Sequence, residues 1–371
     1  MKIRLPRQEL QEALQAVALL TSGRTTRPIL NCVRLDVVGE ELELSGTDGE
    51  SGLRVKIPCL QVSKPGATVV GTDRLLQVIR EFPDVEIVLT VKDRHCVLSG
   101  EGSEFKLFVQ SADDFPAVPK FDGDPDLVID ARELSRIITL TAYAAARETS
   151  RYAINGVLWQ KQGKRLFLVA TDGRRLARAG APLSKSDAAD FEIIVPAKAL
   201  QVFDKIGGHG HSEGESEVEV KVLPNQVLLR FDGKELSSAL VDGHFPKYED
   251  VLPQGNDKEV TMTATEFYSA IRRAALLTTE DSRAVRLTFG KDMLTIQSQS
   301  PEQGEARIEM PVESNTDKLE IGFNPAFLSD ALKVLPYEKV TIELSESFKP
   351  GVLRGENQND FLYVVMPVTL T

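Results

Sequence analysis

The sequence predicts an α+β protein in which one domain design occurs three times. Amphipathic helical segments and alternating strand segments follow one another in the same order three times. Each copy also ends on an aromatic or other apolar residue followed by proline. A chain of 371 residues is too long for one ordinary hydrophobic core, which agrees with several domains. We place the domains at 1–124, 125–254 and 255–371, each with two helices packed on antiparallel sheets.

Each predicted domain begins with an amphipathic helix. In the first one, Leu10, Leu14, Val17 and Leu20 recur at the spacing of one helical face. The pattern predicts first helices at 6–22, 130–147 and 263–277, and second helices at 71–82, 196–206 and 324–335. The second helices open with Asp, Asn or Pro in the first turn, as helix N-termini often do.

Between the helices, apolar and polar residues alternate. Segments 85–91, 217–222 and 339–344 show this period of two, which is typical of half-buried antiparallel strands. The copies then end on Phe115-Pro116, Phe245-Pro246 and Met366-Pro367.

A turn in the middle copy is followed by two arginines. Residues 166–169 are apolar, and Thr171-Asp172-Gly173 comes directly after them, with Arg174 and Arg175 next. Asp-Gly favours a tight turn. Alone, this stretch indicates a hairpin with solvated arginines, but Thr47-Asp48-Gly49 repeats it in the first copy. The turn therefore belongs to the repeated design.

Composition limits the class of protein. Apolar content is 42% and charged content 27%, as in soluble globular proteins. No apolar run approaches the roughly 20 residues that cross a bilayer, and residues 1–6 lack the apolar core of a signal peptide. Cys32, Cys59 and Cys96 are odd in number and widely spaced, which indicates neither a disulfide framework nor a zinc site. We therefore expect a cytoplasmic protein.

Sequence motifs for catalysis are missing. There is no phosphate-binding glycine loop, no HExxH and no Gly-x-Ser-x-Gly elbow. His209 and His211 stand in a Gly-rich loop without a cluster of further ligands. We expect no catalytic residues, no cofactor and no metal. Two other classes of function stay open: a metal-dependent hydrolase, and a protein-binding scaffold without a DNA role.

The charges are distributed unevenly along the chain. The net charge of −11 argues against a nucleic-acid partner, because phosphate binders are usually basic. The predicted helices with their adjoining loops are nevertheless slightly basic, and the acidity lies on the strands and other loops. A local basic surface can exist within an acidic protein.

Several motifs together resemble the bacterial sliding clamp family, the beta subunit of DNA polymerase III. They are Arg24 with residues 28–30, residues 151–156, residues 170–176, residues 241–246 with Tyr248, residues 321–324 and residues 363–367. The resemblance covers the whole chain. It implies a head-to-tail homodimer, a ring of six domains with helices lining the hole, which slides on duplex DNA without reading its sequence. The implied partners are a clamp loader, replicative and translesion polymerases, and repair proteins that carry clamp-binding peptides.

The same resemblance assigns three sets of residues. Candidate DNA contacts are Arg24, Arg80, Arg151, Tyr152, Lys198 and Arg283. The candidate dimer interface joins Arg74, Val78, Phe105 and Leu107 to Leu276, Leu277 and Glu302, although the apolar members could equally be core residues. The candidate peptide-binding pocket comprises Ile154, Thr171, Gly173, Arg174, Arg175, Leu176, Pro246, Val251, Asn324, Phe327, Val364, Val365, Met366, Pro367 and Val368.

A few positions depart from the family pattern. Gly102 and Glu104 stand where basic residues precede the interface Phe105, and Glu148 stands where a glutamine approaches DNA. Arg174 replaces a histidine, and the tail 368–371 lacks a basic residue and runs one residue further. These departures predict a different ionic contact at the interface and a shifted peptide preference.

Overall fold

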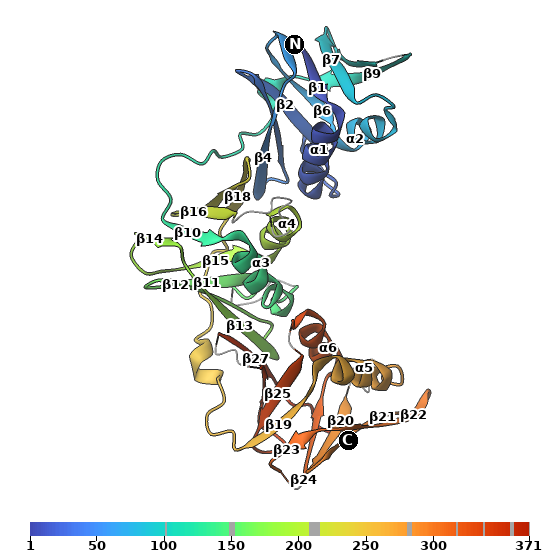
Figure 1. The fold of residues 1–371 in the computed structure, drawn as a ribbon, viewed down its shortest axis with the longest axis vertical. Coiled ribbons are helices and arrows are strands. Elements are labelled where there is room, and N and C mark those ends of the chain that lie inside the picture. Colours follow the sequence, from blue (N-terminus) through green and yellow to red (C-terminus); the bar gives the residue numbers. More distant parts are fainter. Residues whose placement is uncertain are drawn as a thin grey trace. The chain divides into compact units, whose positions relative to one another are not determined.

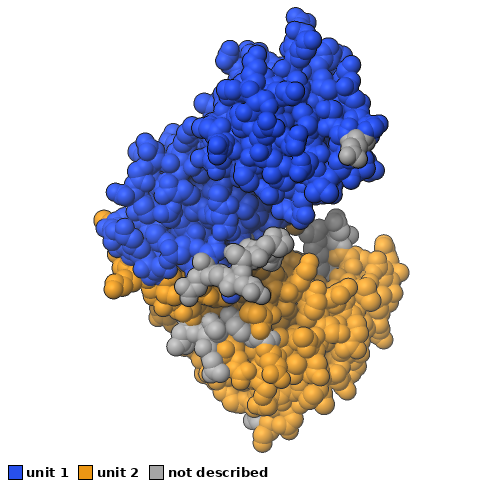
Figure 2. Space-filling model, turned by 45° about the horizontal axis from the view of Figure 1, so that its top comes forward, with its two compact units in different colours: residues 1–132, 183–188, 198–240 blue, residues 133–182, 189–197, 241–371 orange. Residues whose placement is uncertain are grey.

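The computed structural model describes residues 1–100, 102–147, 153–207, 216–279, 284–316, 318–336, 338–356 and 360–370. The chain forms two compact units (Figure 2). Unit 1 comprises residues 1–132, 183–188 and 198–240, and unit 2 comprises residues 133–182, 189–197 and 241–371.

Unit 1 contains a continuous antiparallel sheet whose strands are shared by the first and middle domains. In spatial order its strands are β14 (Lys185–Ser186), β10 (Leu127–Asp130), β16 (Glu217–Leu223), β17 (Gln226–Phe231), β18 (Lys234–Ala239), β4 (Ser51–Pro58), β3 (Glu41–Thr47), β2 (Cys32–Val38), β6 (Ala67–Gly71), β9 (Ser103–Gln110), β8 (His95–Gly100), β7 (Glu86–Lys92), β1 (Lys2–Pro6) and β5 (Gln61–Lys64). Short 3₁₀ turns lie at Pro28–Asn31 and Ala112–Asp114.

Helices α1 (Arg7–Thr21) and α2 (Thr72–Glu81) lie side by side against the strands of the first domain (Figure 1). Helix α4 (Ala197–Gly207), apart from its first residue, belongs to the same unit. Leu10, Leu14 and Val17 of α1 are fully buried, as the helical period predicts. Their burial fixes which face of α1 turns away from the core.

Unit 2 contains two sheets. The larger one runs β15 (Phe191–Pro196), β11 (Gly156–Gln162), β12 (Arg165–Thr171), β13 (Arg175–Pro182), β27 (Phe361–Val365), β26 (Gly351–Gly355), β25 (Lys339–Leu344), β19 (Lys258–Thr263) and β23 (Glu313–Ser314). The smaller one runs β22 (Gly304–Pro311), β21 (Met293–Ser300), β20 (Val285–Gly290) and β24 (Lys318–Phe323). Helices α5 (Ala264–Ala275) and α6 (Pro325–Val334) pack on each other (Figure 1), and 3₁₀ turns lie at Ala142–Ala144 and Tyr248–Val251.

The middle domain contributes strands to both units because each of its sheets continues into a neighbouring domain. Strand β18 pairs with β4 of the first domain, and β13 pairs with β27 of the third. Main-chain hydrogen bonds across these two seams therefore join the domains.

The predicted helices form, and one of them is shorter than expected. Five begin and end within two residues of the predicted bounds. The prediction of a helix over 130–147 is wrong in length, because α3 (Ala131–Thr139) is followed only by a 3₁₀ turn. The hydroxyl of Thr141 hydrogen-bonds the Ile137 carbonyl at 2.6 Å as the helix ends, a side-chain bond that competes with continued helix. The Gly-rich loop with His209 and His211 lies outside the described residues.

No helix in the described part of the chain combines the length and apolar character needed to cross a bilayer.

Candidate functional site

The Thr-Asp-Gly turn of the middle domain has a fixed geometry. The Thr171 hydroxyl donates to the Arg175 carbonyl at 2.6 Å and accepts from the Gly173 amide at 3.1 Å. The Asp172 carboxylate accepts from the amides of Arg174 and Arg175 at 2.9 and 3.1 Å. Gly173 has φ +86°, a backbone conformation that favours glycine. The turn thus closes β12 onto β13 and presents Arg174 and Arg175.

The side chain of Arg175 is held inside the protein. It is 9% exposed and bonds Asp172 at 3.1 Å, Asp330 of α6 at 2.7 Å and the Tyr143 carbonyl at 3.0 Å. Its guanidinium also stacks on the Phe327 ring, 4.7 Å from the centroid. Ion pairing with a rigid fork of donors and stacking on an aromatic face are what arginine does better than lysine. Arg175 therefore joins the middle domain to the third domain.

Two tyrosines complete this network. Burial raises the pKa of Tyr143 and of Tyr363 well above the usual value, so both hydroxyls stay neutral. The Tyr363 hydroxyl donates to the Phe327 carbonyl at 2.9 Å. Arg175 thus holds the ring of Phe327, and Tyr363 holds its main-chain carbonyl.

Main-chain hydrogen bonds fix the C-terminal strand β27 and the tail that follows it. In β27, Val364 and Val365 are buried and lie opposite Leu176 and Arg175 of β13. The Met366 amide then donates to the Arg174 carbonyl at 2.9 Å, and the Val368 amide donates to the Gly322 carbonyl at 2.8 Å. The tail is therefore tied down by main-chain bonds rather than frayed.

Beyond β27, apolar side chains reach the surface. Met366, Val368 and Val251 are exposed, while Pro367, Pro246, Ile154 and Phe327 are half-buried. Asn324 caps α6 by accepting from the Ala326 amide at 2.9 Å, a common role of asparagine. Exposed apolar side chains next to buried ones of the same strand can receive an apolar ligand.

The sequence prediction missed Phe348. This exposed aromatic stands in the turn before β26, whose first residue Gly351 lies opposite Val365. Phe348 therefore belongs to the same end of the sheet as Met366. An aromatic residue within the polar stretch 345–350 is the signal that could have found it.

The candidate DNA contacts are only partly described. Arg24, after α1, and Arg80, in the last turn of α2, are exposed. Lys198 of α4 is exposed and ion-pairs with Asp48 of the first Thr-Asp-Gly turn. Arg151, Tyr152 and Arg283 lie outside the described residues.

Asp48 occupies the same position in its turn as Asp172. Burial alone would raise the pKa of Asp48, but hydrogen bonds from Lys198 and from the amides of Ser51 and Glu50 outweigh burial and lower it. Gly49 has φ +100°, which matches Gly173. With Arg24, Lys198 and Asp48 line a groove of about 270 Å³.

The candidate interface residues lie at two separate edges. On the first domain, Arg74 of α2 is exposed and Val78 half-buried, while Phe105 and Leu107 lie on β9. On the third domain, Leu276 at the end of α5 is 75% exposed. Leu277 is half-buried, and Glu302 is exposed in the turn before β22.

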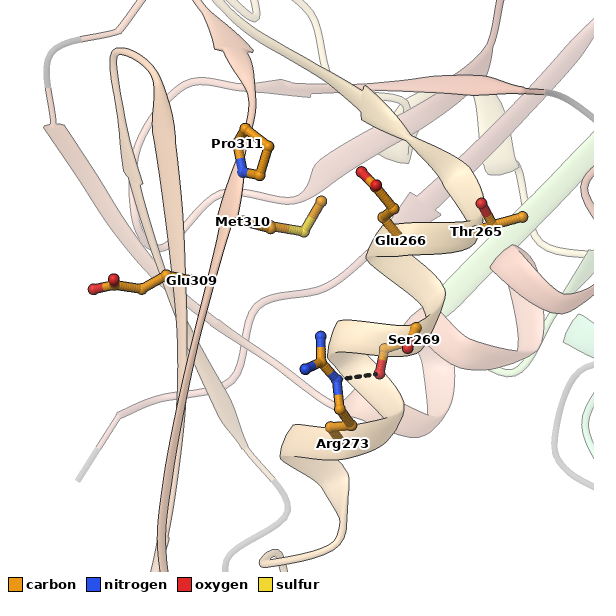
Figure 3. Close-up of a pocket in the computed structure, with 7 residues that line it drawn as sticks. All are labelled: Thr265, Glu266, Ser269, Arg273, Glu309, Met310 and Pro311. Carbon is orange, nitrogen blue, oxygen red and sulfur yellow. Dashed lines mark hydrogen bonds between the residues drawn. The ribbon is translucent and has the colours of Figure 1, made fainter.

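Both edges have unpaired backbone in the described part of the chain. Strand β22 is the last strand of its sheet, and β9 pairs only with β8 over Ser103–Phe108. A groove of about 350 Å³ separates β22 from α5, with Met310 reaching toward the helix and Arg273 bonded to the Ser269 carbonyl (Figure 3). Such edges are templates for pairing with another chain.

A triplicated α+β chain whose sheets continue from one domain into the next has the architecture of a clamp-type protein. Family models of the DNA polymerase III beta subunit match it three times: the N-terminal domain over 1–119, the central domain over 128–247 and the C-terminal domain over 249–369. The chain belongs to the DNA polymerase III beta subunit family, the bacterial DNA sliding clamps.

Similar proteins agree over the whole length. The beta sliding clamps of Pseudomonas aeruginosa and Escherichia coli are 34% and 31% identical, each covering 100% of both chains. A crystal structure of the P. aeruginosa clamp bound to griselimycin matches with a TM-score of 0.93 at 34% identity, again over 100% of both chains. The Bacillus subtilis clamp matches with a TM-score of 0.92 at 25% identity and the same coverage.

Proposed function

We propose that this clamp is a non-catalytic processivity factor that closes around duplex DNA as a head-to-tail homodimer. The observation that carries the proposal is that unpaired strand backbone lies in both the first and the third domain of the described chain. Each chain offers one such edge at β9 and a different one at β22. Two unlike edges on one chain form a heterologous contact, which makes a ring when its rotation closes. The three domains would span 1–124, 125–254 and 255–371.

Retention on DNA then comes from topology and not from affinity. Weak contacts to phosphates, without reading of the bases, let a protein slide. The candidates are the exposed Arg24 and Arg80, together with Lys198, Arg151, Tyr152 and Arg283. Lys198 contributes less, because Asp48 already neutralises it.

The exposed apolar side chains after β27 serve a second purpose. We assign to them the binding of short apolar peptides from polymerases, the clamp loader and repair proteins. The pocket residues are those named from the sequence, with Phe348 added because it stands beside the same strand end. Apolar walls with a pliable methionine suit such peptides. With three free cysteines, the chain suits the reducing cytoplasm, where the DNA also is.

Loading on circular DNA tests the ring. Clamp loaded onto a nicked circular plasmid should remain bound in salt that removes electrostatic binders, and cutting the plasmid once should release it. A short open-ended duplex should bind weakly, with affinity that falls as salt rises. Equal retention on cut and uncut plasmid would overturn the proposal.

A further inference from the structure

The C-terminal tail is attached to the rest of unit 2 at two points. The first is the hydrogen bond of 2.9 Å from the Met366 amide to the Arg174 carbonyl, in the turn between β12 and β13. The second is the hydrogen bond of 2.8 Å from the Val368 amide to the Gly322 carbonyl in β24. Pro367 stands between these two points and has no N–H to donate. The tail is therefore tethered to the larger sheet at one end and to the smaller sheet at the other.

The second point of attachment requires a residue without a side chain. A Cβ atom on Gly322 would stand 2.6 Å from the Val368 carbonyl oxygen and 2.7 Å from Cδ2 of Leu370. Atoms that are not bonded to each other do not approach this closely. The Val368 oxygen also belongs to the main chain, so it cannot rotate away as the end of a side chain can. A glycine inside a strand often marks such a close approach of another backbone.

The neighbours of Gly322 in β24 show on which face of the smaller sheet the tail lies. Ile321 and Phe323 are fully buried in the core. Because side chains alternate between the two faces of a strand, a side chain at 322 would stand on the other face, with the exposed Glu320. Leu370 occupies that place instead and is half-buried there. The end of the tail therefore covers a small part of the outer face of the smaller sheet.

Strand β24 is in turn fixed relative to the end of β27. The Phe323 ring lies against the α-carbon of Gly351, since a Cβ atom there would stand 3.0 Å from Cζ of Phe323. Gly351 begins β26 and lies opposite Val365. The packing of the two sheets thus sets the distance that Met366 and Pro367 must span to reach Gly322.

We propose that Gly322 positions the apolar side chains of Met366 and Val368 for peptide binding. The inference rests on the peptide pocket proposed above and adds a residue that acts through the tail. With the main chain held on both sides of Pro367, these two exposed side chains keep one arrangement before a peptide arrives. Preorganisation raises affinity, because binding then does not have to order the segment.

Gly322 also relates the tail to another wall of the pocket. Two residues further along the chain, Asn324 caps α6, and Phe327 lies in the first turn of that helix. The short connection from β24 to α6 therefore positions the tail and Phe327 together.

Gly322→Ala tests the proposal with the smallest possible side chain. The added methyl group should displace Val368, so hydrogen exchange of the C-terminal fragment, measured by mass spectrometry, should become about tenfold faster. A synthetic peptide of the pattern Gln-Leu-x-Leu-Phe should bind about tenfold more weakly in isothermal titration calorimetry. Gly71→Ala is the matched control. Gly71 also lies in a strand that precedes a second helix, and a Cβ atom there would meet no atom within 4 Å, so both measurements should stay unchanged.

A second pair of variants breaks the same bond from the side of the tail. Val368→Pro removes the amide that donates to Gly322, whereas Val368→Ala shortens the side chain and keeps the amide. Val368→Pro should therefore bind the peptide about fivefold more weakly than Val368→Ala does. Val368 is exposed, so neither change disturbs the core.

The outcomes separate the inference from the function on which it rests. If the unchanged protein does not bind the peptide, the peptide-binding function itself is refuted. If the unchanged protein binds and Gly322→Ala exchanges no faster than it, alanine is accommodated with the tail in place and the inference is wrong. Faster exchange with equal peptide affinity would also overturn it, and so would equal affinities of Val368→Pro and Val368→Ala.

Discussion

Arg175 shows how one side chain can hold two domains together. Its guanidinium bonds two carboxylates and a carbonyl and stacks on Phe327. The family resemblance places Arg175 among the candidate peptide-binding residues, yet its donors already have partners within the chain. In the proposed peptide pocket, Arg175 would therefore act indirectly, through the position of Phe327.

Replacing Arg175 should consequently lower stability. Arg175→Ala should reduce the free energy of unfolding by about 1.5–3 kcal/mol, the range for hydrogen bonds to charged groups. Arg175→Lys should recover little, since an ammonium cannot replace the planar fork. Arg174→Ala is the matched control, because Arg174 is exposed. Urea unfolding of the three variants measures this, and equal stability of Arg174→Ala and Arg175→Ala would contradict it.

At the level of elements, the last strand does two things. Strand β27 completes the seam with β13, and the residues after it present apolar side chains to solvent. Its main chain is needed for the fold, whereas the side chains of the tail are free to serve binding. Deleting Val365 would disturb the pairing of β27 with β13. Single side-chain changes are therefore the cleaner test of the proposed peptide pocket.

Met366→Ser should weaken the binding of a short apolar clamp-binding peptide, for example one of the pattern Gln-Leu-x-Leu-Phe, about tenfold. A large apolar side chain that a ligand buries completely contributes about 1.5–3 kcal/mol of transfer free energy to binding, and a partly buried one contributes less. The serine variant lacks this contribution. Met293→Ser is the control, because Met293 is about as exposed as Met366 (46% against 44%). Isothermal titration calorimetry compares them, and an equal loss in both variants would place the pocket elsewhere.

At the scale of the whole molecule, the proposed ring depends on apolar surfaces that a single chain leaves exposed to solvent. Phe108 on β9 and Leu276 after α5 are 82% and 75% exposed, at the two edges that the ring would bring together. Large exposed apolar side chains of this kind mark interaction sites.

Leu276→Asp should therefore give a folded monomer. An exposed aspartate costs the single chain little, but an unpaired charge in an interface costs several kcal/mol. Leu277→Asp added to it should strengthen the effect. Leu60→Asp changes another exposed leucine, next to β5, which β1, β7 and β8 separate from β9, and should remain a dimer. Circular dichroism checks the fold and sedimentation checks the mass; a dimeric Leu276→Asp protein would exclude this helix end from the interface.

The sequence by itself determined the triplication, five of the six helices to within two residues, and the family. These features follow from local periodicity, because an amphipathic helix or strand displays its buried face in its own residues. Tertiary structure alone decided that both sheets of the middle domain continue into its neighbours. A seam is made by backbone groups, which every residue carries, so it has no signature in the sequence. Tertiary structure also decided the partners of Arg175, because Tyr143 and Asp330 are distant in the chain and only folding brings their oxygens to the guanidinium.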